Sequence, residues 1–342
     1  MSFDLAAASA PRVAVIVPAY GVAHLVGEAL ASLQAQTFAA WECVVVDDGA
    51  PDDVAGAVAP FLNDPRIGFL ATANHRLPGA RNRAIAASRA PYVALLDGDD
   101  LFRPDYLERM VAAFDADPAA RFVTCNARIF GAVERARLCV DAKQGTGNGA
   151  TGSLADVLDR SFNVYIGSLF RRTDWQTVGG FDESFTHCED LDFWVRLLLL
   201  GGHVRYLDAV LGEYRVRPGS LSGDASKMIR GNLRVYDKAL AALGEGPEAG
   251  VVHRMMAENH ALLAVEEALQ QVAAGDVCRG LPALRAAWRG GGPAWQMAFW
   301  FWRVAPGTAP PILRWRQARN SRGGGGHWVS ALAAKSAEAR SA

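Results

Sequence analysis

The sequence predicts an α/β fold with a mostly parallel central sheet flanked by helices, followed by a C-terminal helical extension. In the first half, short apolar runs typical of buried strands alternate with stretches of helical periodicity. Such alternation is typical of βαβ units and of a parallel sheet. Beyond about residue 224 the apolar residues follow helical spacing only, which predicts the helical extension.

The expected elements follow one another in a regular order. Strands are expected at Val13–Val17, Cys43–Val46, Arg66–Leu70 and Tyr92–Leu96. An amphipathic helix follows the first strand, and a second helix is expected over Arg81–Ser88. Two further helices are expected C-terminally, at Met228–Leu243 and Val251–Val272. Ligands of such sheets bind at the carboxyl ends of the strands, which is where the polar clusters of this sequence fall.

Composition excludes several classes of function. The 342 residues carry a formal net charge of −1, so no global basic field predicts nucleic acid as a partner. Five cysteines, without a CxxC pair, favour a reduced, cytoplasmic compartment over a disulfide framework. The first residues lack the basic region of a signal peptide, and no apolar run is long enough to cross a bilayer.

The strongest candidate site is the sequence LLDGDD at Leu95–Asp100. An apolar strand ends there in Asp97, Asp99 and Asp100, whose charges repel one another unless a cation lies among them. Mg²⁺ or Mn²⁺ suits such oxygen ligands and is commonly held by one or two carboxylates together with substrate phosphates. The alternative is a polar turn that caps a helix.

Acidic residues also follow a second expected strand, in the sequence VVVDDGAPDD at Val44–Asp53. Asp47 could accept hydrogen bonds from a base or a ribose, whereas helix capping and turn formation are the favoured roles of Asp52 and Asp53. A third cluster, PGARNRAI, places Arg81 and Arg83 near an expected helix start. That arrangement suits anions, although helical arginines are usually solvated surface residues.

A fourth cluster precedes the helical pattern that begins near residue 189. Thr186 and Glu189 stand in the T-x-x-E relation of a capping box, which gives Glu189 a structural role. Asp190 lies beside it in the expected first turn, where the helix dipole keeps a carboxylate ionised, as a general base requires. Capping and catalysis are equally supported for Asp190 by these residues alone.

Taken in order, these pieces resemble the family 2 glycosyltransferases of GT-A fold, a Rossmann-like architecture. The resemblance covers about residues 12–222 and rests on VAVIVPAYG, VVVDDGAPDD, GARNRAI, LLDGDD, GGFDE and CEDLDFWVRL. It implies an inverting transfer of a sugar from a nucleotide-sugar donor, a UDP-sugar being favoured, to an acceptor hydroxyl. The acceptor would be a glycan, a lipid-linked molecule or another envelope component.

The resemblance also implies roles for individual residues. Asp99 would hold Mn²⁺ or Mg²⁺, and Asp190 would take the proton from the acceptor hydroxyl. The donor would be bound by Pro18, Tyr20, Asp47, Arg81, Asp97, Gly98 and Arg217. Supporting or acceptor-side roles would fall to Glu189, Asp100 and Arg83.

One departure from the family pattern concerns Arg217. Many relatives have histidine in an R-x-H-x-x-S run, whereas this sequence has Arg217 at that position. Arginine cannot ligate a metal but can hold a phosphate with two hydrogen bonds. The resulting hypothesis is that Arg217 neutralises the leaving diphosphate and reduces the dependence on metal ligation.

The resemblance and the composition of the C-terminal part together indicate a domain plan. Residues 1–224 would form the catalytic domain, with a donor-binding part at about 12–100 and an acceptor-binding part at about 101–224. Residues 225–320 would form the helical region, and 321–342 a disordered tail. The loop of residues 144–152 is either an acceptor-side lid or a plain connection.

Two rival functions and one open question remain at this point. A nucleotidyltransferase would also need a strand-end aspartate and a metal, and a non-catalytic nucleotide- or sugar-binding module could keep the fold. The tryptophan- and arginine-rich segment near the C-terminus either packs on the protein or a partner subunit, which is favoured, or rests on a membrane. The predicted location is therefore cytoplasmic, with peripheral contact at the inner face of the cell membrane as the alternative.

Overall fold

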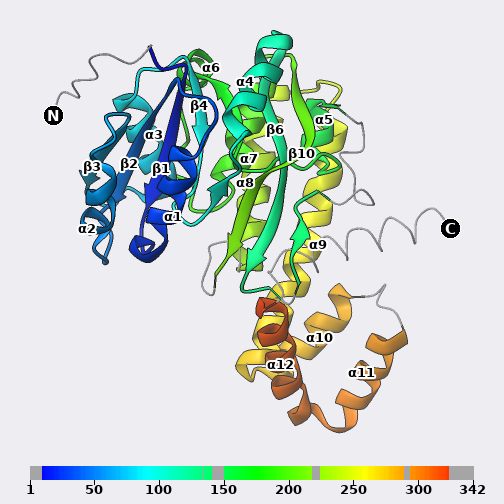
Figure 1. The fold of residues 1–342 in the computed structure, drawn as a ribbon. Coiled ribbons are helices and arrows are strands. Elements are labelled where there is room, and N and C mark those ends of the chain that lie inside the picture. The colour runs from blue at the N-terminus through cyan, green and yellow to red at the C-terminus, as the bar shows by residue number, and fades with distance from the viewer. Residues whose placement is uncertain (1–9, 134, 141–149, 218–223, 289–292, 323–342) are drawn as a thin grey trace. The chain divides into compact units, whose positions relative to one another are not determined.

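The computed structural model describes residues 10–133, 135–140, 150–217, 224–288 and 293–322. The chain divides into two compact units (Figure 1). The first comprises residues 1–130 and 136–215, and the second comprises residues 131–135 and 216–342. Each unit is described separately, and the domain boundary near residue 224 stays a prediction.

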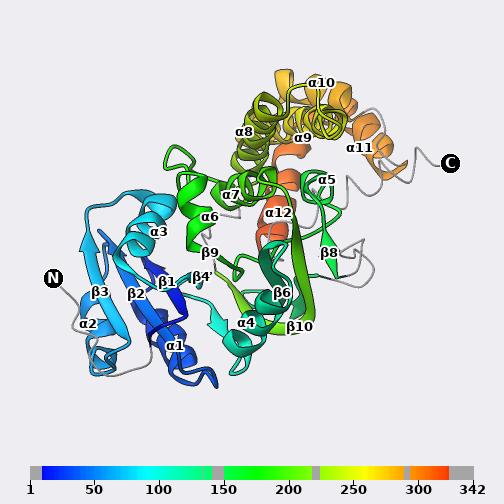
Figure 2. The ribbon, with the colours of Figure 1, turned by 90° about the horizontal axis from the view of Figure 1, so that it is seen from above.

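The first unit begins with four parallel strands in the order β3-β2-β1-β4. The elements of this part are β1 (Val13–Ala19), α1 (Ala23–Gln34), β2 (Trp41–Asp48), α2 (Val54–Val58), η1 (Ala59–Phe61), β3 (Ile67–Thr72), α3 (Arg76–Ala87) and β4 (Tyr92–Leu95). All seven residues of β1 are buried, because helices cover both faces of the sheet there. Figure 2 shows α3 on one face of these strands, with α1 and α2 on the other. All four expected strands are present.

The second part of the first unit continues the same sheet with antiparallel pairs. The strand β9 runs antiparallel to both β4 and β6, and β5 runs antiparallel to β10. The elements here are β5 (Leu101–Phe102), α4 (Tyr106–Ala116), β6 (Ala120–Gly131), β7 (Arg137–Leu138), β8 (Thr151–Gly152), α5 (Leu154–Leu158), β9 (Leu169–Arg171), α6 (Arg172–Thr177), α7 (Glu189–Leu199) and β10 (His203–Val216). The α/β prediction is confirmed, but the expected mostly parallel sheet is mixed: the described pairs are parallel across β3-β2-β1-β4 and antiparallel in the other half.

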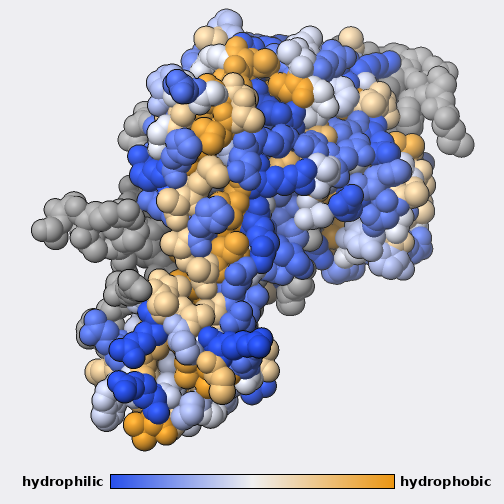
Figure 3. Space-filling view, turned by 180° about the vertical axis from the view of Figure 1, so that it is seen from behind, coloured by the Kyte–Doolittle hydropathy of each residue, from blue (hydrophilic) through white to orange (hydrophobic). Residues whose placement is uncertain are grey.

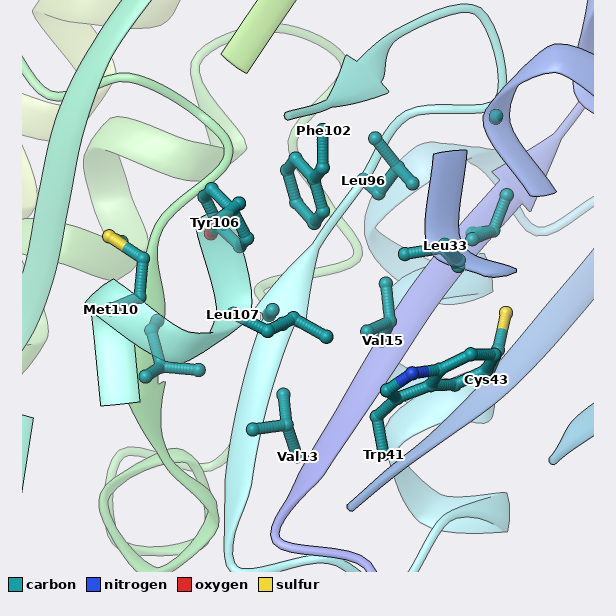
Figure 4. Packing of buried hydrophobic residues seen from close by; sticks show 14 of the residues in the cluster. Val13, Val15, Leu33, Trp41, Cys43, Leu96, Phe102, Tyr106, Leu107 and Met110 are labelled. Carbon is teal, nitrogen blue, oxygen red and sulfur yellow. The ribbon is translucent and has the colours of Figure 1, made fainter. Parts of the chain in front are cut away.

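The apolar core of the first unit packs α1 and α4 against the sheet. Figure 4 shows Val15, Trp41 and Cys43 of neighbouring strands meeting side chains of α1 and α4. The rings of Phe102 and Tyr106 stack with centroids 3.6 Å apart, and both side chains are buried. This packing fixes the strand ends from which the candidate site residues emerge.

A second group of aromatic side chains holds α7 in place. Phe193 of α7 contacts the rings of Phe170 and Phe181, with centroids 4.9 and 4.1 Å apart, and Trp194 stacks on Phe122. These side chains are fully buried, and aromatic pairs of this kind add stability beyond their buried area. The start of α7, which carries Glu189 and Asp190, is therefore well anchored to the sheet.

The second unit is helical, as predicted. It contains α8 (Ala225–Leu243), α9 (Ala249–Ala274), α10 (Val277–Ala287), α11 (Pro293–Val304), η3 (Pro306–Thr308) and α12 (Ala309–Arg322). One apolar cluster joins α9, α10, α11 and α12, and a smaller one joins α8 and α9. In the part of the chain that the structure describes, no helix is long and apolar enough to cross a membrane.

Three predicted segments differ from the structure or lie partly outside its described residues. The helix expected to begin at Arg81 begins at Arg76, because Pro78 is tolerated within a first turn. The predicted disordered tail was wrong for residues 321 and 322, which belong to α12, while residues 323–342 lie outside the described part. Residues 144–149 of the glycine- and threonine-rich loop also lie outside the described part, and Thr151–Gly152 form β8. All five cysteines are free thiols in the structure.

Candidate active site

The parallel strands bring two of the acidic loops to one edge of the sheet. Asp47 of β2 pairs in register with Ala19 of β1, the residue before Tyr20. β4 pairs with the other side of β1 and ends at Leu95, two residues before Asp97. The carboxyl ends of these strands therefore place Tyr20, Asp47 and the loop that begins at Asp97 along the same edge.

Gly98 allows the loop after β4 to lie directly against the end of β1. A Cβ atom at Gly98 would come within 3.0 Å of both the Pro18 carbonyl oxygen and a Val22 methyl group. Contacts this short are tighter than most Cβ contacts, so a side chain at position 98 would push the loop or its neighbours apart. Pro18 is itself buried, which makes it part of the wall behind the loop.

Asp100 is the buried member of the acidic loop. Its side chain accepts a hydrogen bond from the Arg215 backbone N–H at 2.7 Å, while the other carboxylate oxygen has no hydrogen-bond partner among the described residues. Burial, together with the charges of Asp97 and Asp99, raises the pKa of Asp100 well above its usual value. Asp97 and Asp99 are half-buried and closer to solvent.

Arg215 also supports this loop through its side chain. Its Nε donates to the Asp99 carbonyl oxygen at 2.8 Å, and its Nη2 contacts a Glu28 carboxylate oxygen at 2.6 Å. The guanidinium group lies 4.6 Å from the centre of the Phe130 ring. The sequence analysis missed Arg215 and selected Arg217, two residues further on, because the pattern alone does not show which of the two arginines faces the loop.

Arg81 joins the acidic loop to the start of α7. Its two terminal nitrogens each donate to a carboxylate at 2.8 Å, one on Asp97 and the other on Glu189. The Arg81 side chain is only 1% exposed. Burial alone would lower the pKa of Arg81, but the nearby charges of Asp97, Glu189 and Asp190 outweigh it and raise the pKa.

Several carboxylates surround the single cation Arg81, and their charges affect the pKa of Glu189. Burial raises the pKa of Glu189 to about 7, although the charge of Arg81 acts in the opposite direction. Asp190 and Asp97 add to the rise because their charges repel a carboxylate at Glu189. Glu189 therefore takes up a proton at a higher pH than an ordinary glutamate does.

The expected capping box at the start of α7 was wrong. Helix α7 begins at Glu189 itself, after Cys188, which adopts a left-handed conformation with φ of 62° and makes no side-chain cap. Glu189 therefore occupies the first helical position rather than the third, and its carboxylate forms an ion pair with Arg81. Asp190 is half-buried, and its Oδ1 accepts from the Leu191 N–H at 2.8 Å.

Asn82, next to Arg81, fixes the segment that precedes α7. Its side-chain nitrogen donates to the Phe181 carbonyl oxygen and its oxygen accepts from the Phe181 N–H, both at 2.8 Å. The same oxygen accepts from Trp175 Nε1 at 3.2 Å. Gly180 has φ of 77°, and a Cβ there would come within 2.7 Å of the Asn82 oxygen. Sequence reasoning did not assign Asn82 a role.

The acidic side chains near the end of β2 have two roles: some cap helices, and one has a carboxylate that solvent can reach. Asp53 caps α2 by accepting from Gly56, as expected, whereas Asp52 accepts from Gly21 and Ala23 and so caps α1. One Asp47 oxygen accepts from the Ala50 N–H at 2.8 Å. Asp47 is half-buried, so its carboxylate stays accessible to a ligand.

The remaining candidates are placed as follows. Tyr20 directly follows β1 and is 53% exposed. Arg83 lies at the surface and forms an ion pair with Glu183 at 3.3 Å. Arg217 follows β10 directly and is half-buried in the second unit. The expected anion site at a helix start near Arg81 was wrong, because α3 begins five residues earlier.

The carboxylate ligands that the acidic loop offers suit a hard divalent cation. Among the described residues no group of three or more potential ligands comes together as a closed metal site. Asp97 and Asp99, however, are half-buried carboxylates beside the buried Asp100. One or two carboxylates with substrate phosphates are the usual ligands of Mg²⁺, so the residues present fit a metal that binds together with a diphosphate.

Comparison with known proteins agrees with this fold. Residues 14–178 match the family described as Glycosyl transferase family 2. The chain is 30% identical over 271 residues to the succinoglycan biosynthesis protein ExoU of Rhizobium meliloti, covering 72% of this chain and 75% of that protein. The chain therefore belongs to the family 2 glycosyltransferases. The family match ends at residue 178, before Glu189 and Asp190.

Other relatives show how the lengths compare. Succinoglycan biosynthesis protein ExoO of Rhizobium meliloti is 34% identical over 225 residues, which cover 62% of this chain and 63% of that protein. The uncharacterized protein y4gI of Sinorhizobium fredii is 31% identical over 217 residues, but these span 61% of this chain and only 23% of that protein. Both relatives thus contain long stretches that the alignment does not reach.

Solved structures confirm the GT-A fold. S. aureus TarS 1–349 in complex with UDP-GlcNAc matches with a TM-score of 0.62 and 19% identity, covering 80% of this chain and 81% of that one. The mannosyltransferase PcManGT of Pyrobaculum calidifontis, in complex with GDP-Man and Mn²⁺, matches with a TM-score of 0.60 and 20% identity. It covers 94% of this chain and 89% of its own. At such identities the likeness establishes the fold.

Proposed function

We propose that this glycosyltransferase moves a sugar from a nucleoside-diphosphate sugar, preferably a UDP-sugar, to a hydroxyl of a glycan, lipid-linked or other envelope acceptor. The observation that carries this proposal is Arg81, which holds Asp97 and Glu189 at 2.8 Å each. It brings a donor-side loop and the residue pair Glu189–Asp190 into one site. The names of ExoO and ExoU support a polysaccharide as the product.

In the proposed mechanism Asp190 acts as the general base. It takes the proton from the acceptor hydroxyl, whose oxygen then attacks the anomeric carbon of the donor sugar. The bond from that carbon to the diphosphate breaks, and its electrons leave with the diphosphate. Attack from the face opposite the leaving group inverts the anomeric centre. Glu189, held by Arg81, positions Asp190 at the start of α7.

The donor side of the site would bind the nucleotide and stabilise the leaving group. Tyr20 would stack on the base and Asp47 would accept a hydrogen bond from it, while Asp97 would contact the ribose. Asp99 would hold Mn²⁺ or Mg²⁺, which supplies positive charge to the leaving diphosphate when bound. The complex of PcManGT with GDP-Man and Mn²⁺ supports metal use in this fold. Arg217 would add a second positive charge through hydrogen bonds to the diphosphate.

A thermal-shift screen of the purified chain tests the donor site. UDP, GDP, dTDP and CMP would each be added with Mn²⁺, Mg²⁺ or EDTA. A ligand at 100 times its Kd stabilises a protein by about 2.7 kcal/mol, so a clear shift is expected with UDP and metal. Asp99→Asn should lose the metal-dependent part of the shift, whereas Asp53→Asn, which alters only the cap of α2, should keep it.

The other outcomes of this screen discriminate between the alternatives. A UDP shift that is the same in EDTA would favour Arg217 over Asp99 as the main partner of the diphosphate. The absence of a shift with every nucleotide would contradict the donor site. For turnover, release of a nucleoside diphosphate supports sugar transfer, whereas release of pyrophosphate would indicate a nucleotidyltransferase.

A further inference from the structure

The C-terminal helices carry a local positive charge that the net charge of the chain conceals. The whole chain has 35 basic and 36 acidic residues, yet residues 277–322 contain no aspartate, glutamate, lysine or histidine. The same segment contains eight arginines. They are Arg279, Arg285, Arg289, Arg303, Arg314, Arg316, Arg319 and Arg322. This part of the second unit therefore attracts anionic partners.

The same helices expose most of the large apolar side chains at the surface. Of nine such exposed side chains in the described ranges, six lie on α11 and α12. They are Met297, Trp300, Phe301, Val304, Ile312 and Trp315, with exposed fractions between 45% and 77%. Large exposed apolar side chains that gather in this way mark interaction sites. Figure 3 shows apolar and hydrophilic residues interleaved on one face of the molecule.

Helix α11 has two apolar faces, and only one of them is used for packing. Trp295, Phe299 and Trp302 form ring contacts with one another and join the cluster of α9, α10 and α12. Met297, Trp300, Phe301 and Val304 follow the spacing i, i+3, i+4, i+7 and form an outer stripe. Because Trp302 is 4% exposed whereas Trp300 is 70% exposed, the outer stripe contributes little to the core.

We propose that the outer stripe of α11 (Met297, Trp300, Phe301 and Val304) docks this enzyme on an anionic membrane surface. Interfacial helices combine bulky apolar and aromatic side chains with arginines, and they lie in the headgroup region without crossing the bilayer. Arg303 and Arg314 are exposed beside the apolar side chains and suit lipid phosphates. α11 has twelve residues, too few to span a bilayer.

Charge favours a membrane over a second copy of the chain as the occupant of this surface. A twofold dimer would bring the same face of each copy together. Arginines of one copy would then meet arginines of the other, with no acidic residue from this segment to pair with them. An anionic lipid surface supplies the opposite charge to the exposed Arg303 and Arg314.

Sedimentation of the full chain with vesicles tests this inference. We expect binding to vesicles of phosphatidylglycerol and phosphatidylcholine, and much weaker binding to phosphatidylcholine alone. Trp300→Ser combined with Val304→Ser should lower the partition coefficient at least about tenfold, because two exposed apolar side chains are lost. The matched control is Leu62→Ser, which removes an exposed apolar side chain of the first unit and should leave binding unchanged.

The vesicle-binding result is independent of whether the proposed function is correct. The doubly substituted chain should keep its nucleotide-dependent thermal shift, since the substituted residues are exposed in the second unit. The inference fails if the unaltered chain does not bind anionic vesicles, or if the double variant binds as well as the control. It also fails if the chain forms a dimer that the double substitution abolishes, because that would assign the stripe to a second copy.

Discussion

Arg81 is expected to be indispensable for stability because it is the buried cation between two carboxylates. Arg81→Met keeps most of the side-chain volume and leaves Glu189 and Asp97 without their shared partner. Removing one member of a buried ion pair typically costs about 3–5 kcal/mol. Arg83→Met is the control on the same helix: its ion pair with Glu183 is partly exposed, so its loss should cost about 1 kcal/mol or less.

Urea unfolding followed by tryptophan fluorescence measures these differences, and pH adds a second test. In Arg81→Met the loss should be smaller at pH 5 than at pH 8, because a protonated Glu189 does not need the cation. Adding Glu189→Gln to Arg81→Met should restore part of the stability, since a buried neutral amide costs less than an unpaired carboxylate. If Arg81→Met were no more destabilising than Arg83→Met at pH 8, the bridging role of Arg81 would be refuted.

Three further predictions concern single features of the site. Burial raises the pKa of Glu189 from 4.5 to about 7. The contribution of Glu189 to the free energy of unfolding is therefore fully present below pH 4.5 and is lost as the pH rises through 7. Glu189→Gln should remove this pH dependence of stability from a series of urea unfolding curves. Gly98→Ala should weaken the metal-dependent nucleotide shift by pushing the loop from Pro18, whereas Gly250→Ala, with no atom within 4 Å of the new Cβ, should not. Asp52→Ala should lower the free energy of unfolding by about 1 kcal/mol, because it removes the cap of α1, and an unchanged urea midpoint would contradict this.

The strands and the strand-end acids could be predicted because they depend on local pattern. The continuous apolar runs of β1, β2 and β4 each indicate a buried strand, and the runs of β2 and β4 lead directly into aspartates. The parallel order then brings Asp47 and Asp97 to one edge of the sheet without further information. The second half was harder, because the direction of β9 and β10 depends on tertiary packing.

The bridge through Arg81 could not be predicted from spacing. Arg81 and Glu189 are separated by 108 residues, and nothing in either segment indicates the partner. The capping box was expected from a local motif, but the left-handed Cys188 places Glu189 at the first helical position and Arg81 supplies a stronger partner. Arg81 was predicted to bind ligand from its type and position, and that role stays a prediction; in the structure its two terminal nitrogens donate to Asp97 and Glu189.

The central claim is that Asp190 activates an acceptor hydroxyl for attack on a bound nucleotide-sugar. The measurement that tests it most directly compares the chain with Asp190→Asn for nucleoside-diphosphate release from a UDP-sugar in the presence of acceptor and Mn²⁺. We predict that Asp190→Asn keeps the nucleotide-dependent thermal shift and loses about 10²–10⁴-fold in turnover, the usual contribution of a general base. Turnover equal to that of the unaltered chain, with donor binding intact, would contradict the account.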